Sequence, residues 1–250
     1  QLVSQNKKRG WIKFYTGKAA DYITIKNFTP PNDQVQSHGI YCSTFDGKDC
    51  YAVFAQSYTY GVEPLYFAKL NVATGDTTTI YTFNKSEQGE WYRGFDIYAL
   101  SYNPKTNEIY GLGKGYETKI IDGEEQVVRA FTTINIINKE TGKIDKVMDL
   151  PIVYYNFCFD YDGNCYMVCP KTKNETEDVA IGTNLVKFDS DFNKLSVIEC
   201  KSQWGETYIQ RYFGTMSFDY TTGNLWWIPV GNQGATTLYS VNTETGIYEG

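Results

Sequence analysis

Two segments of the sequence bring aromatic, guanidinium and carboxylate side chains together within a few residues. These side chains are Trp91, Tyr92 and Arg93 in the first segment, and Trp204, Glu206, Tyr208, Arg211 and Tyr212 in the second. Aromatic rings cover the apolar C–H surface of a sugar or a peptide, while arginine and carboxylate groups bind hydroxyls or charges. The segments therefore predict a surface that binds a glycan or a protein. In the alternative interpretation, Trp91 and Trp204 are hydrophobic plugs between packed sheets.

Side chains suited to catalysis are few. A Ser-His-Asp site would need the single histidine, His38, and the G-x-S-x-G motif of a nucleophile elbow is absent from the sequence. An acid pair for glycoside hydrolysis can be drawn from Glu90, Asp96, Asp178 and Glu206. We assign no catalytic residue and favour a binding protein over an enzyme, with a carbohydrate-active enzyme that uses paired carboxylates as the alternative.

Metal-ligand patterns are also weak. One histidine and the lack of any C-x-x-C argue against a zinc site. The segment IDGEEQ offers Asp122, Glu124 and Glu125 as oxygen ligands for calcium, but it departs from the D-x-D-x-D-G pattern. We interpret it as a solvated acidic turn and predict neither a metal nor a cofactor.

Six cysteines raise the question of disulfides. Cys158 and Cys165 flank the turn DYDGN, and Cys42 and Cys50 flank FDGKD. With a two-residue loop at the Asp-Gly of the first turn, Cys158, Cys165 and Cys169 project from one face of the hairpin, and the second pair is arranged in the same way. Both buried free thiols and a cross-strand disulfide are compatible with this pattern.

Charge and hydropathy narrow the class of protein. A net charge of −6 without a basic stripe argues against nucleic acid as a partner. The sequence contains no run of about 18 apolar residues, so we predict no transmembrane segment. The amino terminus QLVSQNKKRG lacks the apolar core of a signal peptide, as a mature chain would after cleavage, and three N-x-S/T sequons at Asn27, Asn84 and Asn174 are compatible with export.

The elements that must position these residues form an internal repeat. Four segments align as a strand, a polar turn and a second strand: IYCSTFDGKDCYAVFA, YALSYNPKTNEIYGLG, YNFCFDYDGNCYMVCP and GTMSFDYTTGNLWWIPV. Each is followed by another hairpin, and three of those carry N-x-x-T-G at the bend, at 71–75, 138–142 and 242–246. Such a unit of four antiparallel strands, without helical periodicity, is typical of a β-propeller blade.

The repeat predicts one all-β propeller domain over residues 1–250, with about four and a quarter blades. Its parts are the outer strands of a preceding blade at 11–28, full blades at 38–84, 97–150 and 154–201, and a last, incomplete blade at 212–250. The chain is then either part of a larger propeller or a small ring completed by its amino-terminal strands. Trp226 and Trp227 lie on the second strand of the last blade, and we expect both to be core residues of a sheet buried on both faces.

Motifs such as SFDYTTGNLW and SYNPKTNEIYGLG make residues 11–250 resemble the secreted β-propellers common in Bacteroidota. The chain lacks the WD dipeptide of WD repeats and the paired glycines of kelch blades, and its motifs specify fold and turn chemistry only. The resemblance implies an exported, lipoprotein-like or surface-attached protein, periplasmic or associated with the outer membrane, that recognises glycans or proteins.

In a propeller, the connections from strand four to the next strand one and from strand two to strand three share one end of the blades, called here the loop face. Both aromatic segments fall on connections of the first kind, so we expect the binding site on the loop face. A partner chain is a further expectation, because an incomplete propeller leaves a strand edge exposed.

Overall fold

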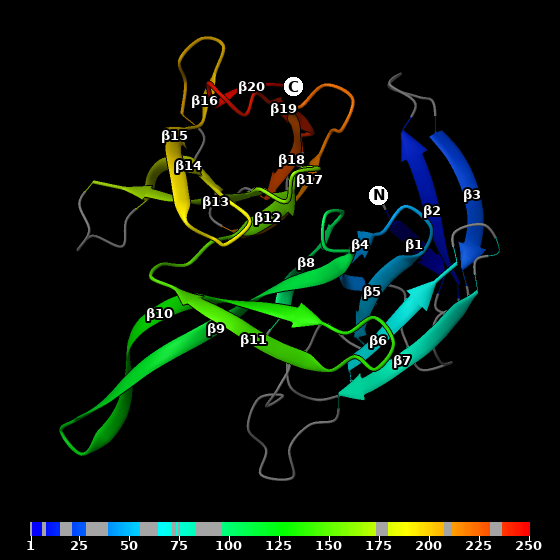
Figure 1. Cartoon of the computed structure of the whole chain (residues 1–250), viewed down its shortest axis with the longest axis horizontal. Coiled ribbons are helices and arrows are strands. Elements are labelled where there is room, and N and C mark those ends of the chain that lie inside the picture. The colour runs from blue at the N-terminus through cyan, green and yellow to red at the C-terminus, as the bar shows by residue number, and fades with distance from the viewer. Residues whose placement is uncertain are drawn as a thin grey trace. The chain divides into compact units, whose positions relative to one another are not determined.

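The computed structural model describes residues 2–6, 9–15, 22–28, 40–55, 65–71, 74, 76–83, 97–173, 180–207, 212–230 and 237–250. These residues form β-strands and turns, without a helix, and the strands assemble into five sheets (Figure 1). Within this part of the chain there is accordingly no helix that could span a membrane. The chain divides into two compact units, residues 1–96 with 137–144, and residues 97–136 with 145–250.

The first unit holds two antiparallel sheets. One has three strands, β1 (Leu2–Asn6), β2 (Arg9–Tyr15) and β3 (Tyr22–Phe28). The other has four, β4 (Ile40–Phe45), β5 (Cys50–Ala55), β6 (Leu65–Leu70) and β7 (Thr77–Phe83). In both sheets, strands that follow one another in the chain lie side by side.

The second unit holds three sheets with the same order of strands. The first sheet consists of β8 (Ile97–Asn103), β9 (Glu108–Ile121), β10 (Glu124–Ile137) and β11 (Ile144–Leu150). The second consists of β12 (Asn156–Phe159), β13 (Cys165–Thr172), β14 (Ala180–Phe188) and β15 (Lys194–Glu199). The third consists of β17 (Tyr212–Phe218), β18 (Leu225–Val230), β19 (Tyr239–Val241) and β20 (Ile247–Glu249), and the short β16 (Lys201–Ser202) pairs in parallel with β20.

The first strands of these three sheets, β8, β12 and β17, lie beside one another. Four-stranded antiparallel sheets that contact one another through their first strands are the blades of a β-propeller. The predicted fold class is confirmed: the chain contains four antiparallel sheets in which four successive strands lie side by side.

Asx turns close the hairpins at the end of the blades opposite the loop face, called here the turn face. In each turn an Asp or Asn side-chain oxygen accepts a hydrogen bond from a backbone N–H two to four residues later. The residues that do so are Asp46, Asn71, Asn103, Asn138, Asp160, Asp189, Asp219 and Asn242. In two of the N-x-x-T-G bends the glycine has a left-handed φ, 69° at Gly142 and 70° at Gly246, as the motif predicts.

The core of the second unit lies between its sheets. One cluster, which includes Ile134, Phe157 and Met167, joins the first and second sheets. A second cluster, which includes Leu185 and Trp227, joins the second and third. Each fully buried side chain of this size contributes about 1.5–3 kcal/mol of burial free energy, so the contacts between blades stabilise the unit.

Only one of the two adjacent tryptophans is a core residue. Trp227 is fully buried in the second cluster, whereas Trp226 is 43% exposed, so the prediction for Trp226 is wrong. Successive side chains of a strand point to opposite faces of the sheet. The face with Trp227 packs on the neighbouring sheet in the second cluster, whereas Trp226 points to the other face and is not part of that cluster.

The cysteine prediction is corrected by the register of the hairpins. The β12–β13 turn contains the five residues 160–164, so Phe159 pairs with Cys165 and Cys158 pairs with Tyr166. Cys158 therefore lies on the face opposite Cys165 and Cys169. In the β4–β5 hairpin, Cys42 pairs with Val53 and Cys50 with Phe45, which again separates the two thiols. All six cysteines are free.

The segment 114–130, which contains the acidic turn IDGEEQ, is the outer part of the β9–β10 hairpin and is called the arm below (Figure 1). Asp122 and Gly123 form its two-residue turn, with left-handed φ values of 54° and 85°. Such a pair is the preferred turn of a tight hairpin, and the isoleucines and valines beside it favour strands. Local turn chemistry thus extends β9 and β10 as far as the Asp-Gly turn.

Candidate functional site

The structure describes part of the predicted ligand-binding set. Trp204 and Glu206 are described in full, and Tyr212 is described as the first residue of β17. Five predicted residues lie outside the described residues: Trp91, Tyr92, Arg93, Tyr208 and Arg211. The geometry of the candidate site is therefore that of the loop 202–206, which follows β16 on the connection between the second and third sheets of the second unit.

Ser202 closes this loop. Its buried hydroxyl Oγ accepts hydrogen bonds from the backbone N–H of Trp204 at 3.3 Å and of Glu206 at 3.0 Å. Its own N–H donates to the carbonyl of Glu206 at 2.7 Å, and its carbonyl accepts from the N–H of Gly205 at 2.8 Å. Gly205 has a φ of 84°, which favours glycine at this point of the tight turn.

The loop is fixed to the outer strand of the third sheet. Lys201 pairs in parallel with Ile247, and its N–H donates to the carbonyl of Gly246 at 3.1 Å. The phenolic hydroxyl of Tyr248, on β20, donates to the carbonyl of Glu206 at 3.2 Å. Hydrogen bonds to the third sheet therefore hold both ends of the turn and fix the position of its tip.

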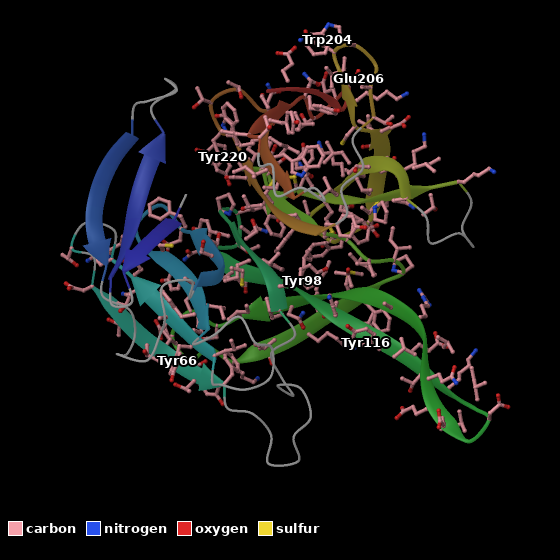
Figure 2. All side chains as sticks on the ribbon, turned by 180° about the vertical axis from the view of Figure 1, so that it is seen from behind. Tyr66, Tyr98, Tyr116, Trp204, Glu206 and Tyr220 are labelled. Atoms are coloured by element: carbon pink, nitrogen blue, oxygen red, sulfur yellow. The ribbon has the colours of Figure 1, made fainter. Side chains whose placement is uncertain are left out.

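Trp204 projects from the tip of this loop into solvent. Its exposed fraction is 79%, and Glu206 is exposed beside it, as Figure 2 shows. The interpretation of Trp204 as a plug between sheets is therefore wrong. An exposed indole next to a carboxylate can cover the apolar face of a ligand and accept hydrogen bonds from it.

Charged groups at the base of the loop pair with one another. Glu199, the last residue of β15, accepts hydrogen bonds from the ammonium groups of Lys171 and Lys201, both at 2.9 Å. These two bonds lower the pKa of the Glu199 carboxyl below its ordinary value. Lys171 and Lys201 are therefore paired with Glu199. Glu206 is the carboxylate nearest to Trp204 in sequence.

The alternative chemistry lies largely outside the described residues. Of the candidate acids for glycoside hydrolysis, the structure describes Glu206, whereas Glu90, Asp96 and Asp178 fall in the undescribed segments, as does His38. Asp122, Glu124 and Glu125 lie at the exposed tip of the arm, where Glu125 accepts a hydrogen bond from the hydroxyl of Thr118 at 2.7 Å. Within the described ranges no three acidic, histidine or cysteine side chains are grouped so as to hold a metal ion.

A second exposed aromatic surface, not anticipated from the sequence, lies on the turn face. Tyr161 and Tyr220 are 65% and 41% exposed, and their ring centroids are 4.2 Å apart. The hydroxyl of Tyr220 donates to the carbonyl of Phe159 at 3.0 Å, which holds the ring in place. The repeated F-D-Y of the third and fourth strand-turn-strand segments is the signal that could have predicted it.

Neither a protein-family model nor a curated protein matches this chain. Solved structures with a similar fold include the GH43_1 enzyme from Xanthomonas citri complexed with xylose, at 12% identity and a TM-score of 0.54, over 85% of this chain and 73% of that one. A protein of unknown function from Bacteroides caccae matches at 11% identity and a TM-score of 0.50, over 98% of this chain and 78% of that one.

TolB from Acinetobacter baumannii matches at 12% identity and a TM-score of 0.50. The match covers 99% of this chain and 51% of TolB, so the chain spans about half the length of that relative. At these identities the similarities support the propeller fold, and they say nothing about activity.

Proposed function

We propose that this chain is a non-enzymatic recognition propeller that binds a glycan or a protein through its loop face. The observation that carries the proposal is Trp204, an indole that is 79% exposed at the tip of a loop fixed by Ser202 and β20. Glu206 supplies a hydrogen-bond acceptor beside the ring. In the proposal, Trp91, Tyr92, Arg93, Tyr208, Arg211 and Tyr212 contribute to the same surface.

We also propose that the protein acts outside the cytoplasm, either secreted or at the cell surface. The three N-x-S/T sequons and the resemblance of residues 11–250 to secreted propellers support this location. A glycan is the ligand class to test first, because an aromatic ring beside a carboxylate suits the C–H face and the hydroxyls of a sugar. A propeller of similar fold has also been solved with xylose bound.

The test compares two exposed aromatic residues on opposite faces of the blades. Wild type, Trp204→Ala and Tyr161→Ala are titrated by calorimetry with xylotriose and with a panel of neutral oligosaccharides. Loss of a stacked ring is expected to weaken binding in Trp204→Ala about tenfold, which corresponds to about 1.4 kcal/mol. Tyr161→Ala is expected to bind as wild type does, and both variants should keep their unfolding midpoint because exposed substitutions change stability by less than about 0.5 kcal/mol.

Equal binding by wild type and Trp204→Ala would refute the assignment of the loop face, and selective loss in Tyr161→Ala would transfer the site to the turn face. The alternative function, a carbohydrate-active enzyme, is distinguished by the release of reducing ends from the same oligosaccharides. Hydrolysis that Glu206→Gln abolishes would replace the recognition proposal with the enzymatic one.

A further inference from the structure

The two exposed tyrosines of the turn face, Tyr161 and Tyr220, are called here the tyrosine pair and join two neighbouring blades. Each directly follows the aspartate that closes its turn, Asp160 after β12 and Asp219 after β17. The ring centroids are 4.2 Å apart and the ring planes are inclined by 42°. Both rings keep exposed surface, 65% of Tyr161 and 41% of Tyr220, so their contact leaves an aromatic surface open to a ligand.

Tyr220, which Figure 2 labels, is fixed in place before any ligand binds. Its hydroxyl donates to the carbonyl of Phe159 at 3.0 Å, and its ring centroid lies 5.1 Å from that of Phe218. Burial raises the pKa of the Tyr220 hydroxyl, which therefore keeps its proton and this hydrogen bond at neutral pH. A ring that is already ordered loses little conformational entropy when a ligand covers it.

The turns around the tyrosine pair are acidic. Four turns form the turn face of the second and third sheets of the second unit, at 160–164, 189–193, 219–224 and 242–246, and the structure describes all four. They contain no lysine or arginine, and their carboxylates are those of Asp160, Asp162, Asp189, Asp191, Asp219 and Glu244. A surface with carboxylates of one sign attracts a cationic partner.

Asp162 is the carboxylate best suited to bind a cation beside the rings. It follows Tyr161 directly and is exposed. Among the described residues its carboxylate takes part in no hydrogen bond or ion pair, whereas the carboxylate of Asp160 accepts several hydrogen bonds within the turn. Lys105 of the first sheet reaches the edge of this surface, where its Cδ would lie 2.8 Å from a Cβ at Gly163. The carboxylate of Asp162 is nevertheless left available to a ligand.

We propose that the tyrosine pair and Asp162 bind an arginine side chain in a basic peptide segment of a partner protein. A guanidinium is planar, so it stacks on a ring face, and its fork of N–H groups donates to a carboxylate at the same time. A lysine ammonium lacks the planar surface and the fork. The carboxylates of the surrounding turns attract further basic residues of the segment. This surface lies at the opposite end of the blades from Trp204, so its test is independent of the glycan titrations.

The turn 189–193 supplies a matched control within the same sheet. Asp189 accepts there the hydrogen bonds from the second and fourth following residues that Asp160 accepts in its own turn. Asp191 takes the position of Asp162 and is likewise exposed, but Ser190 stands where the other turn has Tyr161. The two turns therefore present the same carboxylate with and without an adjacent aromatic ring.

Titration with short peptides tests the class of ligand. The probe is acetyl-Gly-Arg-Gly-Arg-Gly-amide, observed by NMR at low ionic strength over about 10 µM to 10 mM, the range expected for a few exposed contacts. Matched peptides carry lysine, or citrulline as the neutral isostere, in place of arginine. We expect the arginine peptide to bind at least about threefold more tightly than either, because only its side chain both stacks and carries the charge. Added salt should weaken the binding.

Variants then locate the site. Asp162→Asn should weaken binding of the arginine peptide about two- to fivefold, and Asp191→Asn should leave it unchanged. Tyr161→Leu keeps an apolar side chain but removes the ring, so it should weaken binding about two- to fivefold. Tyr161→Trp should bind at least as tightly as wild type, because tryptophan is the best cation–π partner. Trp204→Ala should bind the peptide as wild type does.

The exposed positions of these substitutions should leave the unfolding midpoint unchanged, so altered binding reports the site itself. The proposal is overturned if wild type binds no arginine peptide over the whole range, or binds the arginine and citrulline peptides equally. Equal weakening by Asp162→Asn and Asp191→Asn would reduce the effect to general attraction by acidic turns. Equal binding by Tyr161→Leu and Tyr161→Trp would exclude the rings from the site.

Discussion

Replacing Gly246 by alanine tests the junction between the last two sheets of the second unit, because Gly223 supplies a control with the same backbone conformation. The φ values are 70° at Gly246 and 77° at Gly223. Each glycine ends a turn in the third sheet and donates its N–H to the first residue of that turn, to the carbonyl of Asn242 at 2.9 Å and of Asp219 at 2.8 Å. The two positions therefore differ mainly in what surrounds them.

The surroundings set the size of the effect. Nothing lies within 4 Å of the position that a Cβ would take at Gly223, so Gly223→Ala should cost about 1 kcal/mol, the price of a left-handed alanine. At Gly246 the Cβ would lie 2.6 Å from the backbone oxygen of Glu199, which cannot rotate away. The turn must shift, and the bond from the N–H of Lys201 to the carbonyl of Gly246 weakens. Overpacking and the lost hydrogen bond add about 1–2 kcal/mol, for a total of about 2–3 kcal/mol.

Urea unfolding followed by fluorescence measures both variants against wild type, with equal slopes required for the comparison. We expect Gly246→Ala to lose at least about 1 kcal/mol more than Gly223→Ala, a difference well above the usual effect of a surface substitution. If the two variants have the same midpoint, the contact between Gly246 and Glu199 does not exist in solution. The argument that β16 anchors the Trp204 loop to β20 would then fail with it.

Two further predictions concern the turns and the thiols. Asp160 and Asp189 accept the same set of hydrogen bonds within their turns, but Asp160 is buried and also accepts a hydrogen bond from the hydroxyl of Tyr166 at 3.4 Å. Asp160→Ala should therefore lose about 2–3 kcal/mol and Asp189→Ala clearly less, as thermal unfolding would show; equal losses would contradict the contribution of burial and of the Tyr166 bond. Burial raises the pKa of Cys50 to about 11 and of Cys169 and Cys200 to about 12, so at pH 8 a disulfide reagent should label the folded chain at least about 100-fold more slowly than the chain in urea. Because these pKa values are raised, the protonated thiols contribute their full stability below the ordinary pKa of 9.0, and that stability is lost as the pH rises toward 11–12. The free energy of unfolding should therefore be lower at pH 10.5 than at pH 8.

Most of the fold could be predicted because the residues that determine each turn and strand of a blade lie close together in the sequence. Each turn on the turn face is closed by its own Asp or Asn, and the left-handed glycine of N-x-x-T-G lies within the same few residues. Strands on either side follow from alternation and from β-branched or aromatic residues. Repetition of such a unit at steps of 56–60 residues then leads to a propeller without any knowledge of distant contacts.

Turn length is where this reasoning failed. The Asp-Gly at 162–163 suggested a two-residue loop, but the carboxylate of Asp160 accepts hydrogen bonds from the N–H groups of Asp162 and Asn164 and encloses five residues. The changed register moved Cys158 to the opposite face of the sheet. The same dipeptide at 122–123 does form a two-residue turn, in the arm. The two cases differ in whether an Asp two positions earlier competes for the backbone N–H groups.

Exposure was the other quantity that the sequence could not supply, because it depends on which sheet lies across from a residue. Trp226 and Trp227 are adjacent and chemically identical, yet one is half-exposed and the other is fully buried. Trp204 was equally compatible with a plug and with a ligand contact. Its loop resolves the ambiguity through contacts with residues on β20 that lie 42 to 46 positions away in the chain.

The two faces of the blades use their polar side chains differently, and that difference is what makes the loop face a reasonable place for recognition. On the turn face, the carboxylates of Asp160 and Asp189 accept hydrogen bonds from backbone N–H groups of the turns that they close. In the loop 202–206 the closing hydrogen bonds come from Ser202 and from backbone groups, and none of them uses the side chain of Trp204 or Glu206. Those two side chains can therefore change without loss of the loop, so a loss of binding in Trp204→Ala can be attributed to the missing ring itself.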